Sequence, residues 1–283
     1  MDVFPLYVVY FSKYEICQRE EAVMYRAITL SNGARILTEH IPGVRSAALG
    51  FFVGAGSRHE RGAENGAAHF IEHMSFKGTS RRSAADLAVE MDAIGGQVNA
   101  YTTKESTCFY ARCLDRHLDR AGDLLSGMLF DSRFDEGDVA LERGVILEEI
   151  GMYEDAPEDL CAERLAMAVY KGRALGRPIL GKASTLEKMT GESLRQWQKE
   201  HYVPGAIVAA LAGSFEERHV EALAQQLSAL PAAPVPKTRE ACYLPAVTVR
   251  KKAIEQNHLI LAFPGLSYLD EERYALLLLN SIL

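Results

Sequence analysis

The stretch His69-Phe-Ile-Glu-His73 lies in a mostly apolar run, 67–76, that predicts a helix. Residues four apart share one face of a helix, so His69 and His73 can present two imidazoles to one metal ion. Glu72 lies at the edge of the same face, where a carboxylate can act as a base toward water on that metal. A helix can also carry two histidines for no functional reason, so the motif by itself leaves a metal site and a plain helix as alternatives.

The segments around this helix predict a fold that contains both helices and strands. Asn32-Gly33 between two strand-like runs is a strong hairpin signal. Strands are predicted at 25–30, 34–39, 46–53, 97–101, 107–113 and 206–212, and further helices at 84–94, 114–130, 135–153, 157–170, 190–201 and 216–230. We expect an α+β fold with a mixed, largely antiparallel sheet, helices on one face and the histidine helix packed against the sheet.

The proline-rich segment 231–236 is the strongest domain boundary in the chain. After it, 246–263 is predicted to be rich in strands and 270–283 to be helical, which echoes the order of 46–76. The echo suggests a duplicated two-domain arrangement whose second copy lacks the histidines and is truncated. The predicted organisation is an N-terminal extension at 1–23, which is an accessory arm or a non-native start before Met24, a catalytic domain at 24–230, a linker at 231–240 and an incomplete second homologous domain at 241–283.

The composition is that of a globular protein. The chain has 283 residues, which suits one large or two medium domains. Its net charge of -7 implies no basic surface for nucleic acid. Five scattered cysteines without a C-x-x-C pair argue against a disulfide scaffold and favour a reducing compartment, and no apolar run reaches transmembrane length. We therefore expect a cytoplasmic protein that binds neither nucleic acid nor membrane, with Cys108 and Cys113 as buried thiols.

A zinc hydrolase site needs a third protein ligand, which should be a distant His, Asp or Glu. The helix predicted at 135–153 offers Glu142, Glu148 and Glu149. Glu142 and Glu149 are two turns apart on one face, whereas Glu148 is rotated by about 100° from Glu149. One helix face can thus supply a ligand and a supporting carboxylate. The alternative is that these glutamates are solvated charges on an exposed helix.

Four segments, in order, resemble the pitrilysin/insulinase-type zinc metallopeptidases, the inverzincins, in which the metal motif is inverted to H-x-x-E-H. The resemblance is closest to the mitochondrial-processing-peptidase β-subunit and its bacterial relatives, and it covers the chain from about Tyr25 onward. The matching segments are GAAHFIEHMSFKGT at 66–79, GGQVNAYT at 95–102, ERGVILEEI at 142–150, and Tyr202-x-Pro204 before a strand that ends at Ala212-Gly213.

The resemblance implies a role for each residue of the candidate site. His69, His73 and Glu149 would hold one Zn²⁺ per chain. Family members carry a glutamate ligand about 76 residues after the second histidine, and Glu149 lies 76 residues after His73, which selects it over the preceding glutamate. Glu72 would be the general base, and Glu142 would support a ligand histidine or the helix that carries Glu149.

The implied activity is that of a zinc-dependent endopeptidase, a hydrolase that cleaves peptides or unfolded, presequence-like segments. Asn99 and Ala100 match the family's edge strand, where an extended peptide adds as a further strand. Phe76 is the third substrate-binding candidate, and Asn99 can equally be an ordinary strand-end asparagine. Family members pair two homologous domains, so a homodimer or a partner subunit is expected to complete the site. The alternative hypothesis is a non-catalytic or truncated member that binds zinc but needs a partner or a C-terminal domain for activity.

Overall fold

The computed structural model describes residues 25–238 and 240–282. The predicted extension at 1–23 lies outside these residues. The chain divides into a main unit, which extends to Leu259, and a second unit, which contains the described residues from Ile260 onward. The sheet, the helices α1–α8 and the candidate metal ligands all belong to the main unit.

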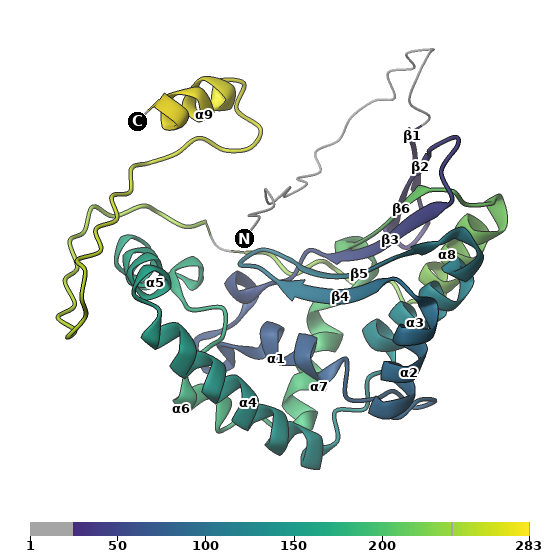
Figure 1. Cartoon of the computed structure of the whole chain (residues 1–283), viewed down its shortest axis with the longest axis horizontal. Helices are drawn as coiled ribbons and strands as arrows, with labels where there is room; N and C mark the ends of the chain where they lie inside the picture. Colours follow the sequence, from purple (N-terminus) through teal and green to yellow (C-terminus); the bar gives the residue numbers. More distant parts are fainter. Residues whose placement is uncertain (1–24, 239, 283) are drawn as a thin grey trace. The chain divides into compact units, whose positions relative to one another are not determined.

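A six-stranded sheet forms the frame of the main unit (Figure 1). Every pair of neighbouring strands is antiparallel except β2 and β6, which are parallel. The mixed, largely antiparallel sheet expected from the sequence is thus confirmed. The strands, in the order β1-β2-β6-β3-β5-β4 across the sheet, are β1 (Tyr25–Thr29), β2 (Arg35–His40), β6 (Ile207–Gly213), β3 (Ser46–Val53), β5 (Thr107–Leu114) and β4 (Gln97–Thr102).

The helices of the main unit gather on one side of this sheet (Figure 1), as predicted. Alternate residues of a strand point to opposite faces, and in β5 Phe109 and Ala111 are buried under the helices whereas Arg112 is exposed. The helices are α1 (Ala67–Met74), α2 (Ala84–Ile94), α3 (Leu118–Phe130), α4 (Glu136–Asp155), α5 (Pro157–Val169), α6 (Ala183–Leu186), α7 (Gly191–His201) and α8 (Glu217–Ser228).

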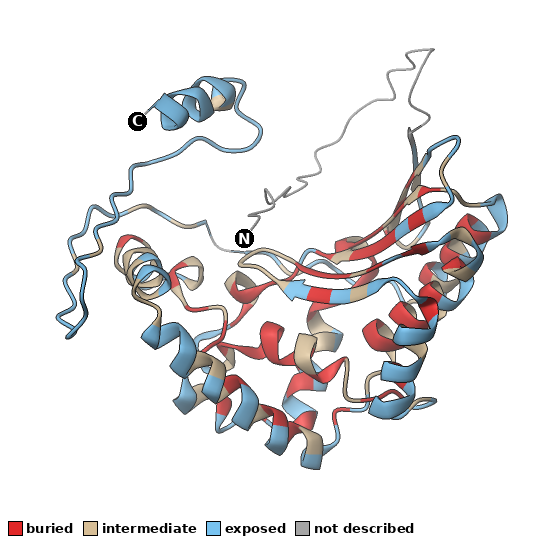
Figure 2. Cartoon of the chain, in the orientation of Figure 1, coloured by how far each residue is buried: buried red, intermediate tan, exposed pale blue. Residues whose placement is uncertain are grey.

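The core lies between the sheet and the helices, where Figure 2 shows the buried residues. Phe51 of β3 and Leu125 of α3 are fully buried there, together with Phe70 and Met74 of α1. Burying one such side chain contributes roughly 1.5–3 kcal/mol. The apolar side of α1 therefore fixes this helix against the sheet, which confirms the packing expected from the sequence.

The prediction that 246–263 is rich in strands is wrong, because the described residues of this stretch form no strand. Val247 and Leu259 are 94% and 81% exposed. A strand needs a neighbour to pair with its backbone groups, and apolar residues in the sequence do not supply that neighbour. In the second unit, the helix predicted at 270–283 is present as the shorter α9 (Arg273–Ile282).

Two further features follow the composition. Cys108 and Cys113 are buried free thiols, as expected. Among the described residues, no helix combines the length and the apolar character that crossing a membrane requires.

Candidate metal centre

The helix α1 begins at a glycine that packs closely against another part of the chain. Gly66 has a φ of +104°, a left-handed conformation that glycine adopts without strain. A Cβ at this position would stand 2.9 Å from the carbonyl oxygen of Leu180. The eight residues of α1 then bury Phe70 and Ile71 in the core, so the histidines lie away from the most apolar side of the helix.

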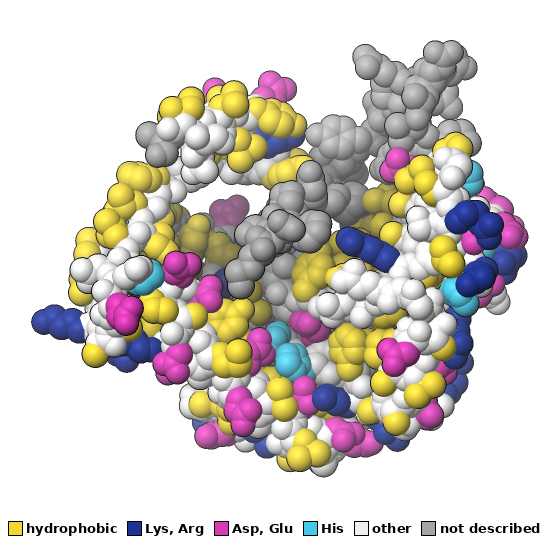
Figure 3. Space-filling view, viewed as in Figure 1, with side chains coloured by type: hydrophobic (Ala, Val, Ile, Leu, Met, Phe, Trp, Pro, Cys, Tyr) yellow, Lys and Arg dark blue, Asp and Glu magenta, His cyan; other side chains and the backbone are white. Residues whose placement is uncertain are grey.

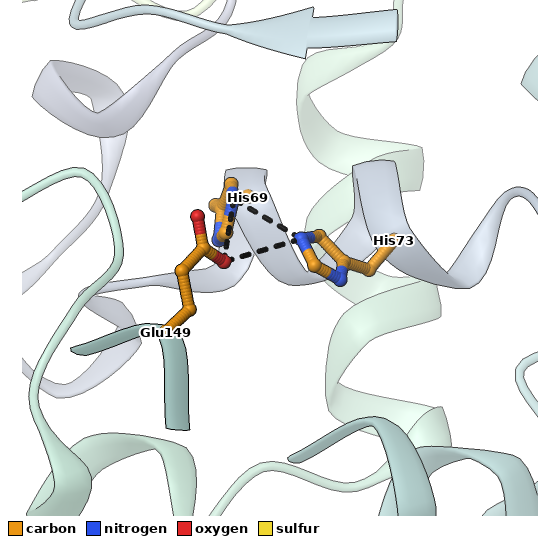
Figure 4. Close-up of side chains that lie close together, drawn as sticks. All are labelled: His69, His73 and Glu149. Atoms are coloured by element: carbon orange, nitrogen blue, oxygen red, sulfur yellow. Dashed lines mark hydrogen bonds and ion pairs between the residues drawn. The ribbon is translucent and has the colours of Figure 1, made fainter. Parts of the chain in front are cut away.

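Three side chains converge between α1 and α4. Figure 4 shows His69 and His73 of α1 directed toward Glu149 of α4. The two histidine Nε2 atoms are 3.2 Å apart, and Glu149 Oε2 lies 3.7 Å from Nε2 of His69 and 3.6 Å from Nε2 of His73. Ligand atoms about 2.0–2.1 Å from a tetrahedral zinc ion stand about 3.3 Å apart. The residues present therefore fit one zinc ion, whereas the alternative ligand Glu148 is exposed.

The cluster is open to solvent on one side. In the space-filling view, histidine side chains lie beside acidic side chains on the face over α1 and α4 (Figure 3). The side chains of His73 and Glu149 are 21% and 31% exposed, whereas that of His69 is only 10% exposed. A small molecule or an extended chain can thus approach the cluster from this face.

Glu142 is hydrogen-bonded to His73, which is the contact that its predicted supporting role requires. Its Oε1 lies 2.8 Å from His73 Nδ1, and because a carboxylate can only accept, Nδ1 carries the proton. That tautomer leaves the Nε2 lone pair of His73 directed at the cluster, which is the form a metal ligand needs. Lys77 Nζ lies 2.6 Å from the other oxygen of Glu142, so the buried carboxylate is paired on both sides.

His69 is neutral but has no comparable support. Burial, and to a smaller extent the neighbouring His73, lowers the pKa of His69 to about 3. Its ring is therefore uncharged near pH 7 and has a lone pair for a metal. Within the part of the chain that the structure describes, the buried Nδ1 of His69 has no hydrogen-bond partner.

Glu72 lies on α1 beside the end of the edge strand. Thr102, the last residue of β4, donates a hydrogen bond from Oγ1 to Glu72 Oε2 at 2.5 Å. The pKa of Glu72 is raised, mainly by burial. The hydrogen bond from Thr102 and the nearby His73 act in the opposite direction, and Glu149 adds a smaller upward effect. A half-buried carboxylate of this kind can exchange a proton with a bound water molecule.

The three substrate-binding candidates occupy different environments. Asn99 is exposed on β4, and its Oδ1 accepts a hydrogen bond from the backbone N–H of Ala100. The side chain of Ala100 is buried, and Phe76 packs partly buried against the core. A peptide on β4 would therefore meet Ala100 through its backbone. The substrate roles of these residues stay predictions.

Sequence reasoning assigned no role to Thr102 or Lys77. Strand alternation places Thr102 on the same face of β4 as the buried Ala100. The sequence pattern could therefore have predicted that Thr102 faces α1. Lys77 follows His73 by four residues, but α1 already ends at Met74, so helical spacing gave no reliable guide to its position.

Two family models match consecutive parts of this chain. The model described as Insulinase (Peptidase family M16) matches residues 35–183, which is more than half of the chain. The chain belongs to the M16 family. A second model, Peptidase M16 inactive domain, matches residues 188–283 of this M16 protein. The first match includes Glu72 and the three candidate ligands, and the domain boundaries predicted from the sequence stay predictions.

Bacterial zinc proteases are similar to this M16 protein over most of its length. The uncharacterized zinc protease YmxG of Bacillus subtilis is 43% identical over 261 residues, which cover 92% of this chain and 64% of the relative. An uncharacterized zinc protease of Streptomyces coelicolor is 42% identical over 268 residues, which cover 91% of this chain and 58% of the relative. The chain thus spans about three-fifths of the length of these curated relatives.

Solved structures share the fold of this M16 protein. The periplasmic protease PqqL from Escherichia coli matches with a TM-score of 0.69 and 27% identity, over 80% of this chain and 26% of that chain. A protease from Helicobacter pylori matches with a TM-score of 0.71 over 77% of this chain and 54% of that chain, and at 20% identity it shows the fold alone.

Proposed function

We propose that this M16 protein is a zinc-dependent endopeptidase. The observation that carries the proposal is the convergence of three ligand atoms, from His69, His73 and Glu149, beside the carboxylate of Glu72. Two imidazoles and one carboxylate are the donor set of a catalytic zinc site with an open fourth position. The zinc proteases among the relatives support the same chemistry.

The residues of the site divide the work of peptide hydrolysis. His69, His73 and Glu149 would hold one zinc ion per chain. When bound, zinc supplies a positive charge that polarises the scissile carbonyl and makes a water molecule more acidic. Glu72 accepts a proton from the attacking water and delivers it to the nitrogen of the leaving amine. The bond from Thr102 holds Oε2 of Glu72 and leaves Oε1 for the proton.

Peptides and unfolded protein segments are the proposed substrates. On its outer side β4 pairs with none of the described strands, so an extended peptide can add to it through main-chain hydrogen bonds. Thr102 ends this strand and contacts Glu72, so a peptide on β4 would lie beside the proposed base. Asn99 and the backbone of Ala100 would bind it, with Phe76 nearby. Main-chain pairing demands little of the substrate's sequence.

A partner is the second part of the proposal. A homodimer, a partner subunit or the additional length of the relatives would complete a substrate chamber around the exposed side of the cluster. The alternative function is zinc binding without activity of this chain alone. The cytoplasmic location stays a prediction that the scattered free cysteines support.

The test combines zinc content with hydrolysis of a quenched fluorescent peptide. Wild type and the control His40→Ala, at an exposed histidine of β2, should bind zinc and hydrolyse the peptide. Glu72→Gln should keep zinc and lose hydrolysis, and His73→Ala should lose both. Zinc without hydrolysis in the wild type would favour the alternative function, and unchanged hydrolysis in Glu72→Gln would contradict the proposed base.

A further inference from the structure

A buried carboxylate outside the metal cluster lies at the start of α1. Glu60 is only 3% exposed and belongs to the polar loop 58–66 before the helix. Its Oε1 accepts from the backbone N–H of Ala68 at 2.9 Å, and its Oε2 accepts from the backbone N–H of Gly66 at 2.9 Å and from Nδ2 of Asn65 at 3.0 Å. All three partners are donors, so these hydrogen bonds favour the ionised carboxylate.

These hydrogen bonds replace the cap that α1 lacks. The first N–H groups of a helix have no partner within the helix, and the N-cap residue Gly66 has no side chain that could accept from them. Glu60 accepts from Ala68 in the first turn, and its negative charge is favoured at the positive end of the helix dipole. Without this carboxylate, the N–H groups of Gly66 and Ala68 would lose their acceptor in a buried place.

The loop that carries Glu60 is anchored to the segment between α5 and α7. Arg177 Nη1 donates to the backbone oxygen of Glu60 at 2.6 Å. Asn65 Nδ2 donates to the carbonyl oxygen of Pro178 at 2.8 Å, and Thr185 Oγ1 donates to the carbonyl oxygen of Asn65 at 2.7 Å. The carboxylate is thus a fixed point against which the first turn of α1 is held.

The two histidines of the cluster differ in what orients them. Nδ1 of His73 is bonded to Glu142, whereas the buried Nδ1 of His69 has no partner among the described residues. His69 is the third residue of α1 and directly follows Ala68. The place of His69 therefore depends on the backbone of the first turn, which Glu60 holds.

We infer that Glu60 is the positioning residue of His69: its carboxylate fixes the first turn of α1 and so places a ligand whose Nδ1 is hydrogen-bonded to none of the described residues. This inference rests on the proposed zinc site. Burying a carboxylate is unfavourable, and desolvation raises the pKa of Glu60 to about 7 although three hydrogen bonds act in the other direction. A costly buried charge in direct contact with a ligand helix is more typical of a functional site than of a structural core.

The test is the zinc affinity of the purified chain at pH 8, measured by competition with a chelator. Glu60→Gln places an NH₂ group where a carboxylate oxygen accepts from N–H donors. We expect zinc affinity to fall about 10- to 100-fold, the range for groups that orient a metal ligand, and amide exchange at Ala68 to accelerate in the metal-free protein. The matched control is Glu64→Gln in the same loop, because this carboxylate accepts from Arg61 instead of α1. Its zinc affinity should equal that of the wild type.

A second control separates positioning from general stability. Leu223→Ala truncates a buried side chain of α8, which packs on β2 and α3, and should leave zinc affinity unchanged. If Glu60→Gln does not fold, Glu60→Asp keeps the charge but withdraws it by one methylene, and it should also weaken zinc binding.

Three outcomes would overturn the inference. If Glu60→Gln binds zinc with wild-type affinity, the inference is wrong and the proposed zinc site still stands. The same holds for Glu60→Asp if Glu60→Gln does not fold. Equal losses of affinity in Leu223→Ala and Glu60→Gln would show a general effect of stability and remove it too. A wild-type chain that binds no zinc would remove the proposed function and the inference with it.

Discussion

Replacement of Glu142 by alanine should weaken zinc binding without removing any ligand. Glu142 is 5% exposed and accepts from His73 Nδ1 at 2.8 Å and from Lys77 Nζ at 2.6 Å. Water can solvate the partly exposed Lys77, whereas the N–H of His73 loses the acceptor that fixes its tautomer. A hydrogen bond to a charged group contributes about 1.5–3 kcal/mol, and about 1.4 kcal/mol corresponds to tenfold in affinity. We therefore expect a loss of about 10- to 100-fold.

Competition with a chromophoric zinc chelator measures this loss. Glu148→Ala is the matched control, because it removes an exposed glutamate from the same helix, and it should bind zinc as the wild type does. Glu142→Gln keeps an oxygen that can accept from His73 but loses the charge, so its loss should be smaller. The reasoning is refuted if Glu142→Ala retains wild-type affinity or if Glu148→Ala loses as much.

Three further predictions concern catalysis and stability. Glu72→Gln should lower kcat for peptide hydrolysis by about 10²- to 10⁴-fold, the usual contribution of a general base, with zinc retained; metal analysis beside the assay checks both, and an unchanged kcat would be incompatible with the base. Thr102→Val should lower kcat about tenfold, equivalent to one hydrogen bond of about 1.4 kcal/mol, and leave KM unchanged, whereas Thr102→Ser should restore the rate; equal rates in the two variants would show that the hydroxyl does not matter. Burial raises the pKa of Glu60 from 4.5 to about 7. Protonation of Glu60 therefore adds to the free energy of unfolding in full below about pH 4.5, and this contribution, roughly 3 kcal/mol, is lost as the pH rises through about 7. Urea unfolding of the metal-free protein should show that the wild type loses more stability than Glu60→Gln between pH 5 and pH 8. If the free energies of unfolding of the two proteins differ by the same amount at both pH values, the pKa of Glu60 is not raised.

The histidine pair could be predicted from sequence because it depends on helical geometry alone. Four residues separate His69 from His73, and any helix over that stretch places them together. The apolar residues between them also determine which side of α1 enters the core. The helix and the one-sided layering are therefore consistent with local patterns in the sequence, whereas the place of β6 between β2 and β3 depends on long-range pairing.

The third ligand could not be assigned from pattern alone, because the buried side of α4 combines apolar and acidic residues. Val139 and Ile146 are buried there together with Glu142, whereas Leu141 is 74% exposed, so hydrophobic periodicity alone singles out neither Glu142 nor Glu149. The distinction between Glu148 and Glu149 came from the family resemblance; in the structure Glu149 lies beside the two histidines and Glu148 is exposed.

Other features depend on contacts between distant segments that no local pattern reveals. Glu60 lies in a loop rich in charged residues, and nothing in the loop marks it as the buried one. Its burial follows from Arg177 and from the packing of Gly66 on Leu180. The stretch 246–263 shows the converse, since its apolar residues predict strands but its described residues pair with none of the strands of the sheet.

X-ray absorption at the zinc edge tests the central claim most directly. The chain loaded with one equivalent of zinc should show nitrogen and oxygen ligands at about 2.0–2.2 Å, with imidazole scattering from two histidines. His73→Ala should lose one imidazole, and Glu149→Ala should weaken binding while keeping both. Sulfur at about 2.3 Å, or a spectrum unchanged in His73→Ala, would place the zinc elsewhere and contradict the account.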